Sequence, residues 1–420
     1  MMKKYAFLAL VLVIGMSSVV NAETKGLNLS GLVINDAVMV SDRDFNSDVP
    51  DTAAFLHTQA NLKAVADLTS NVTGVIELET AVVTGGMPAA MVGGAGATLQ
   101  LEQAYIEAKE AFRKELTLKA GIFDVVYDLR GNGDAFLLDL KRNATFRDQQ
   151  VGGWFARWEQ KPVTVDGFML TLADAGTVNT NVSLLGAVVD YEKEKNLFRA
   201  AVLYGRYEDG NLAVPFGVDG SWFQLGLGAD YFVLNGDLEL YGEFGFQAGT
   251  AAKANPDIDH SGLALYLGAR YNFKVNYKPW IDLSFWYLSG DDPASATDAD
   301  GWFNLGHLNQ TLIVENQEYG FGAGFNDNNY WTIRLEGGLA PTDNTTVMAS
   351  FNMFTLVEVL AGADDAMGIE FDLKGTYAYT SDLSLALGFG VFMPDDGVTG
   401  GGAATDDPTF LINFETALKF

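Results

Sequence analysis

Polar and apolar residues alternate along most of this chain, and the segment 408–420, PTFLINFETALKF, shows the pattern most clearly. Counting back from the terminal Phe420, every second residue is apolar or aromatic except for one threonine, and the residues between them are largely polar. Strict alternation predicts a β-strand with two unlike faces. Such a strand suits the wall of an outer-membrane barrel, with lipid on one side and water on the other. The last strand of a soluble sandwich is the alternative.

The same alternation recurs from end to end and predicts about 18 strands of about 10–13 residues, the length that a tilted membrane strand needs. The predicted strands cover residues 27–40, 55–68, 72–81, 99–111, 115–123, 152–160, 163–172, 182–191, 197–207, 222–233, 237–248, 262–273, 280–288, 330–339, 345–355, 368–379, 382–392 and 409–420. The expected fold is therefore all-β: a transmembrane, antiparallel, up-and-down β-barrel.

The connections between these strands alternate in length. Short turns are expected at 69–71, 112–114, 161–162, 192–196, 234–236, 274–279, 340–344 and 380–381. Longer loops rich in Gly and Asp are expected at 41–54, 82–98, 124–151, 173–181, 208–221, 249–261, 289–329, 356–367 and 393–408. This is the plan of a barrel with short periplasmic turns and long extracellular loops, and it places both termini in the periplasm.

The first 22 residues, MMKKYAFLALVLVIGMSSVVNA, have the features of a secretory signal peptide. Lys3 and Lys4 precede an apolar run, and Val20-Asn21-Ala22 is a small-residue cleavage site. We therefore expect a signal peptide at 1–22 and a single barrel domain at 23–420, exported to the bacterial outer membrane. The terminal Phe420 resembles the assembly signal of outer-membrane proteins, which implies contact with the barrel-assembly machinery.

The composition narrows the possible partners. The formal net charge is −28, and removal of the two signal lysines makes it −30. This acidity argues against nucleic acid as a partner, because nucleic-acid binding needs a basic surface. The chain contains no Cys, so disulfides and thiol chemistry are excluded. Hydrophobic residues make up 48% of the chain, which argues against disorder.

Charged residues in mid-strand fall on the less apolar face of the predicted strands. In the strand 280–288, for example, Ile281 and Leu283 share one face and Asp282 lies on the other. A basic side chain facing lipid at the bilayer midplane would cost about 2–4 kcal/mol, so these charges are assigned to a water-filled lumen. The predicted pore-lining residues are Glu77, Glu79, Glu107, Lys119, Arg157, Arg199, Glu239, Glu243, Arg270, Asp282, Arg334 and Glu336.

The long loop 124–151 is unusually basic, with Arg130, Lys141, Arg142 and Arg147. One interpretation is that it folds inward and forms a basic constriction against an acidic wall, which would select solutes by charge and size. The other is a surface loop whose basic residues pair with local aspartates. Its segment 135–142, AFLLDLKR, has the pattern of a short amphipathic helix.

One acidic loop has partial calcium-loop spacing, with side chains at i, i+2, i+4 and i+6. The residues are Asp42, Asp44, Asn46 and Asp48. Ser47 and Ala53 stand where such a loop needs Gly and Glu, so a bound Ca²⁺ and a solvated surface loop are both possible interpretations. No other cofactor is expected. Acidic clusters in the other extracellular loops would attract divalent ions that bridge lipopolysaccharide, although solvation alone also explains them.

Enzyme motifs are absent from the sequence: G-x-S-x-G, H-E-x-x-H and G-K-[ST] do not occur. No catalytic residue is predicted. Only three histidines are present, and His57 shares a strand face with polar residues, which favours a lumen side chain. A barrel-embedded acyl-chain hydrolase that uses His57 with a serine is kept as an alternative.

The region 103–168 resembles the alginate-export family of outer-membrane channels. The similar pieces are QAYIEAK, LTLKAGIFDVVYDLRGNGD, GGWFARWE and VDGF, with a fainter second block, DGWFNLGHLNQ, at 300–310. Ile122 and Phe123 stand where the family tends to carry an Arg-Gln pair. The resemblance implies a monomeric barrel of 18 strands that passes anionic polysaccharide through a basic pore.

Together these patterns predict a porin-like channel for passive diffusion of small hydrophilic solutes, saccharides or anionic oligosaccharides among them. Outer-membrane lipid and lipopolysaccharide are the expected surroundings. The alternative is a closed-lumen structural or receptor barrel that acts through its extracellular loops.

Overall fold

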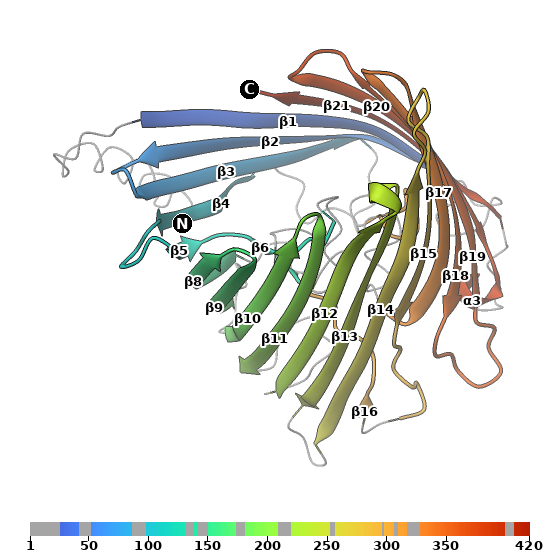
Figure 1. Ribbon diagram of the computed structural model, residues 1–420. Coiled ribbons are helices and arrows are strands. Elements are labelled where there is room, and N and C mark those ends of the chain that lie inside the picture. The colour runs from blue at the N-terminus through green and yellow to red at the C-terminus, as the bar shows by residue number, and fades with distance from the viewer. Residues whose placement is uncertain are drawn as a thin grey trace.

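A computed structural model describes residues 26–41, 52–85, 98–130, 138–140, 150–173, 181–208, 220–252, 257–295, 298–305, 310–316, 328–399 and 407–420 (Figure 1). The predicted signal peptide at 1–22 and the predicted calcium residues Asp42, Asp44, Asn46 and Asp48 lie outside these ranges, as do Lys141, Arg142 and Arg147 of the basic loop. Those predictions stay as predictions.

Eighteen strands form the wall of the barrel within the described residues. They are β1 (Gly26–Ser41), β2 (Ala53–Asp67), β3 (Val72–Gly85), β4 (Thr98–Ala108), β5 (Leu116–Ile122), β8 (Gln150–Gln160), β9 (Val163–Ala173), β10 (Asn181–Lys193), β11 (Asn196–Glu208), β12 (Gly220–Val233), β13 (Leu238–Ala252), β14 (Ile258–Asn272), β15 (Trp280–Leu288), β17 (Tyr330–Thr342), β18 (Thr345–Leu356), β19 (Ala366–Ala378), β20 (Leu383–Pro394) and β21 (Thr409–Lys419).

Each wall strand pairs antiparallel with the next one in the chain, and β21 pairs with β1 to close the barrel. This confirms the predicted fold class and strand count. Closure removes every free edge from the sheet, which a strand-built membrane protein requires. The described residues contain no helix that is both long and apolar enough to span a membrane.

The two faces of the wall differ as the alternation predicts. In β12, Phe223, Leu225 and Leu227 are 39%, 42% and 57% exposed, whereas Trp222 and Gln224, which alternate with them, are buried. The apolar set faces outward and the mixed set faces inward. An apolar outer band is the surface that lipid contact needs.

Four further short elements, β6, β7, β16 and α3, were not predicted. Inside the barrel, β6 (Val125–Val126) pairs with β7 (Asp139–Leu140). The helix predicted at 135–142 is therefore wrong at Asp139–Leu140, because backbone pairing with β6 replaces a helix too short to be stable alone. The others are β16 (Asp298–Ala299), which pairs parallel with β14, and the helix α3 (Asp396–Thr399).

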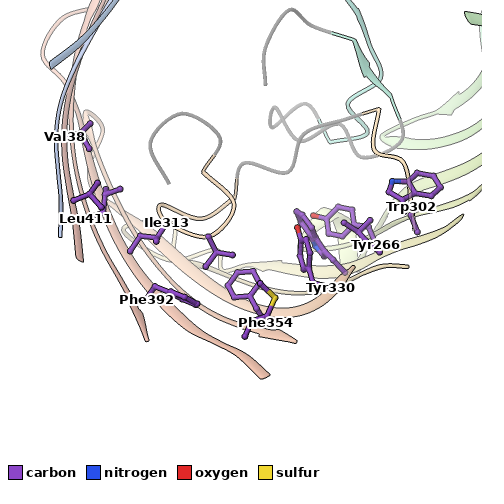
Figure 2. Close-up of a cluster of buried hydrophobic side chains, with 14 of the residues drawn as sticks. Val38, Tyr266, Trp302, Ile313, Tyr330, Phe354, Phe392 and Leu411 are labelled. Carbon is purple, nitrogen blue, oxygen red and sulfur yellow. The ribbon is translucent and has the colours of Figure 1, made fainter. Parts of the chain in front are cut away.

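Parts of the long loops pack inside the barrel. Figure 2 shows Trp302 and Ile313, both from the connection between β15 and β17, in one cluster with the wall residues Phe354, Phe392 and Leu411. Trp302 and Phe392 are 0% exposed and Ile313 is 1% exposed. The hydrophobic effect thus holds the connection against the inner wall and narrows the lumen.

Candidate functional site

A polar cavity of about 590 Å³ lies within the barrel. Its lining comes from nine wall strands and from two inward segments of the long loops. The charged residues that line it are Asp36, Arg130, Arg270, Asp282, Arg334, Glu336, Asp372, Lys374 and Glu415. The cavity therefore presents both signs of charge to whatever occupies it.

The first inward segment, 123–130, follows β5. Gly121 allows the chain to turn there, because its φ of 131° is accessible to glycine and a Cβ would lie 2.2 Å from the carbonyl oxygen of Ala104. Beyond this point Phe123 is 1% exposed, and the chain continues inside the barrel toward Arg130. The described part of the basic loop thus folds inward.

Arg130 bridges two wall strands. Its Nε donates to Glu239 of β13 at 2.6 Å, and its Nη2 donates to Asp282 of β15 at 3.1 Å. Its guanidinium lies 3.6 Å from the centre of the Tyr241 ring, and Tyr241 donates its hydroxyl to Asp282 at 2.5 Å. Burial lowers the pKa of Arg130, but the Glu239 hydrogen bond and the neighbouring rings and acids raise it above its ordinary value overall. The side chain is therefore a fixed positive charge.

The same inward segment has a second anchor at Tyr127. Its hydroxyl donates to Asp166 at 2.7 Å, and Arg157 also donates to Asp166, at 2.8 and 2.6 Å. Arg199 donates to the carbonyl oxygen of Tyr127 at 2.9 Å and pairs with Asp190. Burial, followed by the charge of Asp166, raises the pKa of the Tyr127 phenol well above its ordinary value.

The second inward segment, 310–316, docks on β19 through two carboxylates. The two oxygens of Glu370 accept the backbone N–H groups of Ile313 and Val314 at 2.6 and 2.9 Å, and Glu370 is 0% exposed. Asp372 accepts the N–H of Leu312 at 3.4 Å. A carboxyl group whose two oxygens each accept a backbone N–H anchors a loop at two points.

Some charges on the cavity lining have no ionic partner among the described residues. Arg334 pairs with Glu336 and donates to Gln310. By contrast, Arg270 stacks 3.8 Å from the Trp280 ring and, like Lys374, forms no ion pair within the described part of the chain. These two cations can interact with a solute in the cavity.

The remaining residues predicted to line the pore do not lie on this cavity. Glu239 touches Arg130 from its edge. The others lie on the lumen wall in cross-strand pairs or contacts, with Glu77 bonded to Lys63, Glu79 to Asn61 and Glu107 close to Lys119. Sequence reasoning also missed Asp36, Asp372, Lys374 and Glu415. The alternation of Asp372 and Lys374 with apolar Phe371 and Leu373 was a signal that could have found two of them.

Neither a metal site nor a hydrolytic site is evident among the described residues. They contain no group of three or more His, Asp or Glu residues that could hold a metal ion. His57 lies 3.7 Å from Asp36, and its cross-strand neighbours are Asp36 and Val83, neither of which is a serine. The hydrolase alternative gains no support from this arrangement.

No family model and no curated protein matches the chain. Solved structures of porins do match it. The BenF-like porin from Pseudomonas fluorescens Pf-5 gives a TM-score of 0.61 at 11% identity, over 94% of this chain and 99% of that one. OpdK from Pseudomonas aeruginosa, solved with vanillate, gives 0.59 at 11% identity over 94% and 99%. OprD from Pseudomonas aeruginosa gives 0.57 at 13% identity over 95% and 97%.

At these identities the likeness establishes the fold, a closed barrel of the porin type, over nearly the full length of both chains. It does not establish membership of the alginate-export family, so that resemblance stays a prediction.

Proposed function

We propose that this chain is a porin-like channel of the bacterial outer membrane for passive diffusion of small hydrophilic solutes. The observation that carries the proposal is a polar cavity, with charges of both signs, inside a closed barrel whose outer face is apolar. The apolar outer face can contact lipid, and the polar interior can hold water and polar solutes.

Two inward segments support selection at the narrow part of the lumen. Segment 123–130 brings Arg130 to the cavity, and segment 310–316 brings Gln310, Thr311 and Leu312 to it. Segments held by ion pairs and charge-assisted hydrogen bonds limit the size of a solute, and the opposed charges orient it. No covalent step is part of this mechanism.

The finer parts of the proposal concern cargo and surroundings. Saccharides and anionic oligosaccharides are proposed solutes. Arg270 and Lys374, which form no ion pair within the described residues, favour solute groups that carry negative charge. We also propose that the acidic extracellular loops contact lipopolysaccharide and that Phe420 contacts the barrel-assembly machinery.

The test is single-channel conductance in a planar bilayer, with a salt gradient to read the reversal potential. Conductance steps are expected, and anion preference would favour the anionic cargo, whereas cation preference would mean that the lumen acids dominate. If well-folded protein gives no steps, the channel proposal fails and the closed-lumen structural or receptor barrel is the better account.

A further inference from the structure

His260 is a buried histidine of β14 that contacts two other elements. It is 3% exposed, and both of its ring nitrogens face carbonyl oxygens. Nδ1 lies 2.8 Å from the backbone oxygen of Ala299, and Nε2 lies 3.2 Å from Oε1 of Gln247. Ala299 belongs to β16, which begins the inward segment 298–305, and Gln247 belongs to the wall strand β13.

The orientation of the Gln247 amide is fixed by the backbone of Phe303. The Phe303 N–H donates to Gln247 Oε1 at 2.9 Å, and Gln247 Nε2 donates to the Phe303 carbonyl at 2.7 Å and to Gln224 at 2.8 Å. Exchange of the amide oxygen and nitrogen would break both backbone bonds. The group that faces His260 is therefore an acceptor.

Both partners of the imidazole are thus acceptors. A neutral imidazole carries one N–H and one lone pair, so it can donate to only one of them. The imidazolium carries an N–H on each nitrogen and can donate to both Ala299 and Gln247. The geometry of the site matches the protonated ring.

The charges around His260 act in the same direction. Asp291 and Asp300 face it from the connection after β15, while Asp259 on β14 pairs in register with Asp298 of β16. All four groups are acidic and favour a cation, whereas burial of the ring has the largest single effect and opposes one.

We propose that His260 is a pH-sensitive anchor: its protonation adds a second hydrogen bond that holds segment 298–305 to the barrel wall. Two other contacts of this segment involve no titratable group, since Trp302 donates its N–H to the Ser289 carbonyl and Phe303 packs edge-on against Trp222. Carboxylates hold its first residues as well: the Asp300 N–H donates to Asp291 and the Ser261 hydroxyl donates to Asp300. Segment 298–305 precedes the docked segment 310–316 in the chain. Protonation of His260 at lower pH therefore stabilises one side of the narrowed lumen.

The direct test is the protonation state of the ring in the full chain, refolded in detergent micelles and labelled with ¹⁵N-histidine. The sequence contains only His57, His260 and His307, so the double variant His57→Gln/His307→Gln leaves one signal. Between about pH 8 and about pH 5, the range in which histidine titrates, we expect His260 to gain a proton and show N–H groups on both nitrogens. A ring that keeps a single N–H throughout that range overturns the proposal.

A second readout is hydrogen exchange at the amides of Trp302 and Phe303, corrected for the intrinsic effect of pH. We expect about fivefold stronger protection at the lower pH, the value of one net hydrogen bond. His260→Gln should remove this pH dependence, and His57→Gln should leave it unchanged. Equal pH dependence in His260→Gln and the parent protein would overturn the proposal, and this result does not depend on whether the barrel conducts.

Discussion

The ring of the terminal residue Phe420 lies over Gly31 of the first strand. Their backbones exchange two hydrogen bonds, from Gly31 N–H to the Phe420 carbonyl at 2.8 Å and from Phe420 N–H to the Gly31 carbonyl at 3.0 Å. A Cβ on Gly31 would lie 2.3 Å from Cζ of the ring. The glycine therefore makes room for the terminal aromatic where β1 and β21 close the barrel, an arrangement in which a ring covers an otherwise bare stretch of backbone.

Gly31→Ala is expected to destabilise the barrel by up to about 1 kcal/mol, the value of a cross-strand contact, because the Cβ displaces the exposed ring of Phe420 from its place over β1. The measurement is equilibrium unfolding by urea in micelles. Gly375→Ala is the matched control, because a Cβ at Gly375 of β19 meets nothing within 4 Å.

A double variant separates this contact from the general cost of changing a strand glycine. Phe420→Ala removes the ring, so Gly31→Ala should cost much less in that background than in the parent protein. Additive costs would mean that the ring and the glycine do not interact.

Removal of the Arg130 charge should change conduction. Arg130→Gln leaves Glu239 and Asp282 without their shared cation at the edge of the cavity, so we expect a larger single-channel conductance and a shift of the reversal potential toward cations. Arg113→Gln is the control, since it removes the same charge from an exposed short turn. An unchanged reversal potential in Arg130→Gln would place the selective charge elsewhere.

Gly390 of β20 leaves space for the docked segment 310–316. A Cβ there would lie 2.9 Å from Oδ1 of Asp372 and 3.1 Å from Cβ of Leu312. Gly390→Leu is therefore expected to displace the segment, raise the conductance and admit larger sugars in a liposome-swelling assay. Gly375→Leu, again at an open position, should keep the parental size limit. Equal size limits in both variants would show that segment 310–316 does not set the limit.

The wall of the barrel could be predicted from the sequence because each strand carries its own signal. Alternation in segments such as 280–288 depends on lipid lying on one side and polar groups on the other, and this condition repeats in every strand. The alternation of short turns with long loops then predicted the number of strands. It also predicted that both termini lie at the same end of the barrel.

The interior could not be predicted to the same depth, because it depends on contacts between distant residues. Arg130 was a candidate from its loop, but its partners Glu239 and Asp282 are more than a hundred residues away, and only the closed barrel brings them together. Segment 310–316 carries no charge pattern of its own apart from Glu315, and its anchor, Glu370, looks from the sequence like any lumen carboxylate. The helix predicted at 135–142 failed for the same reason, since β6 supplies a partner that local periodicity does not reveal.

Tyr127 gives a prediction that depends on pH. Tyr127→Phe removes the hydrogen bond to buried Asp166, which should cost about 1–3 kcal/mol at neutral pH. The raised pKa of the folded phenol means that this stabilisation is complete below the unfolded value of about 10 and declines as the pH rises above it, because only the unfolded chain then releases the proton.

The difference in unfolding free energy between the parent protein and Tyr127→Phe should therefore shrink by about 1 kcal/mol between about pH 9 and about pH 11, since each unit of unequal titration corresponds to about 1.4 kcal/mol. Urea unfolding at the two pH values measures it. Tyr379→Phe, at a tyrosine that is 61% exposed beside a short turn, controls for the loss of a phenol as such. If the difference in unfolding free energy stays constant or widens at alkaline pH, the Tyr127 phenol ionises as readily in the folded barrel as in the unfolded chain. In that case Asp166 does not hold the inward segment through a protonated hydroxyl.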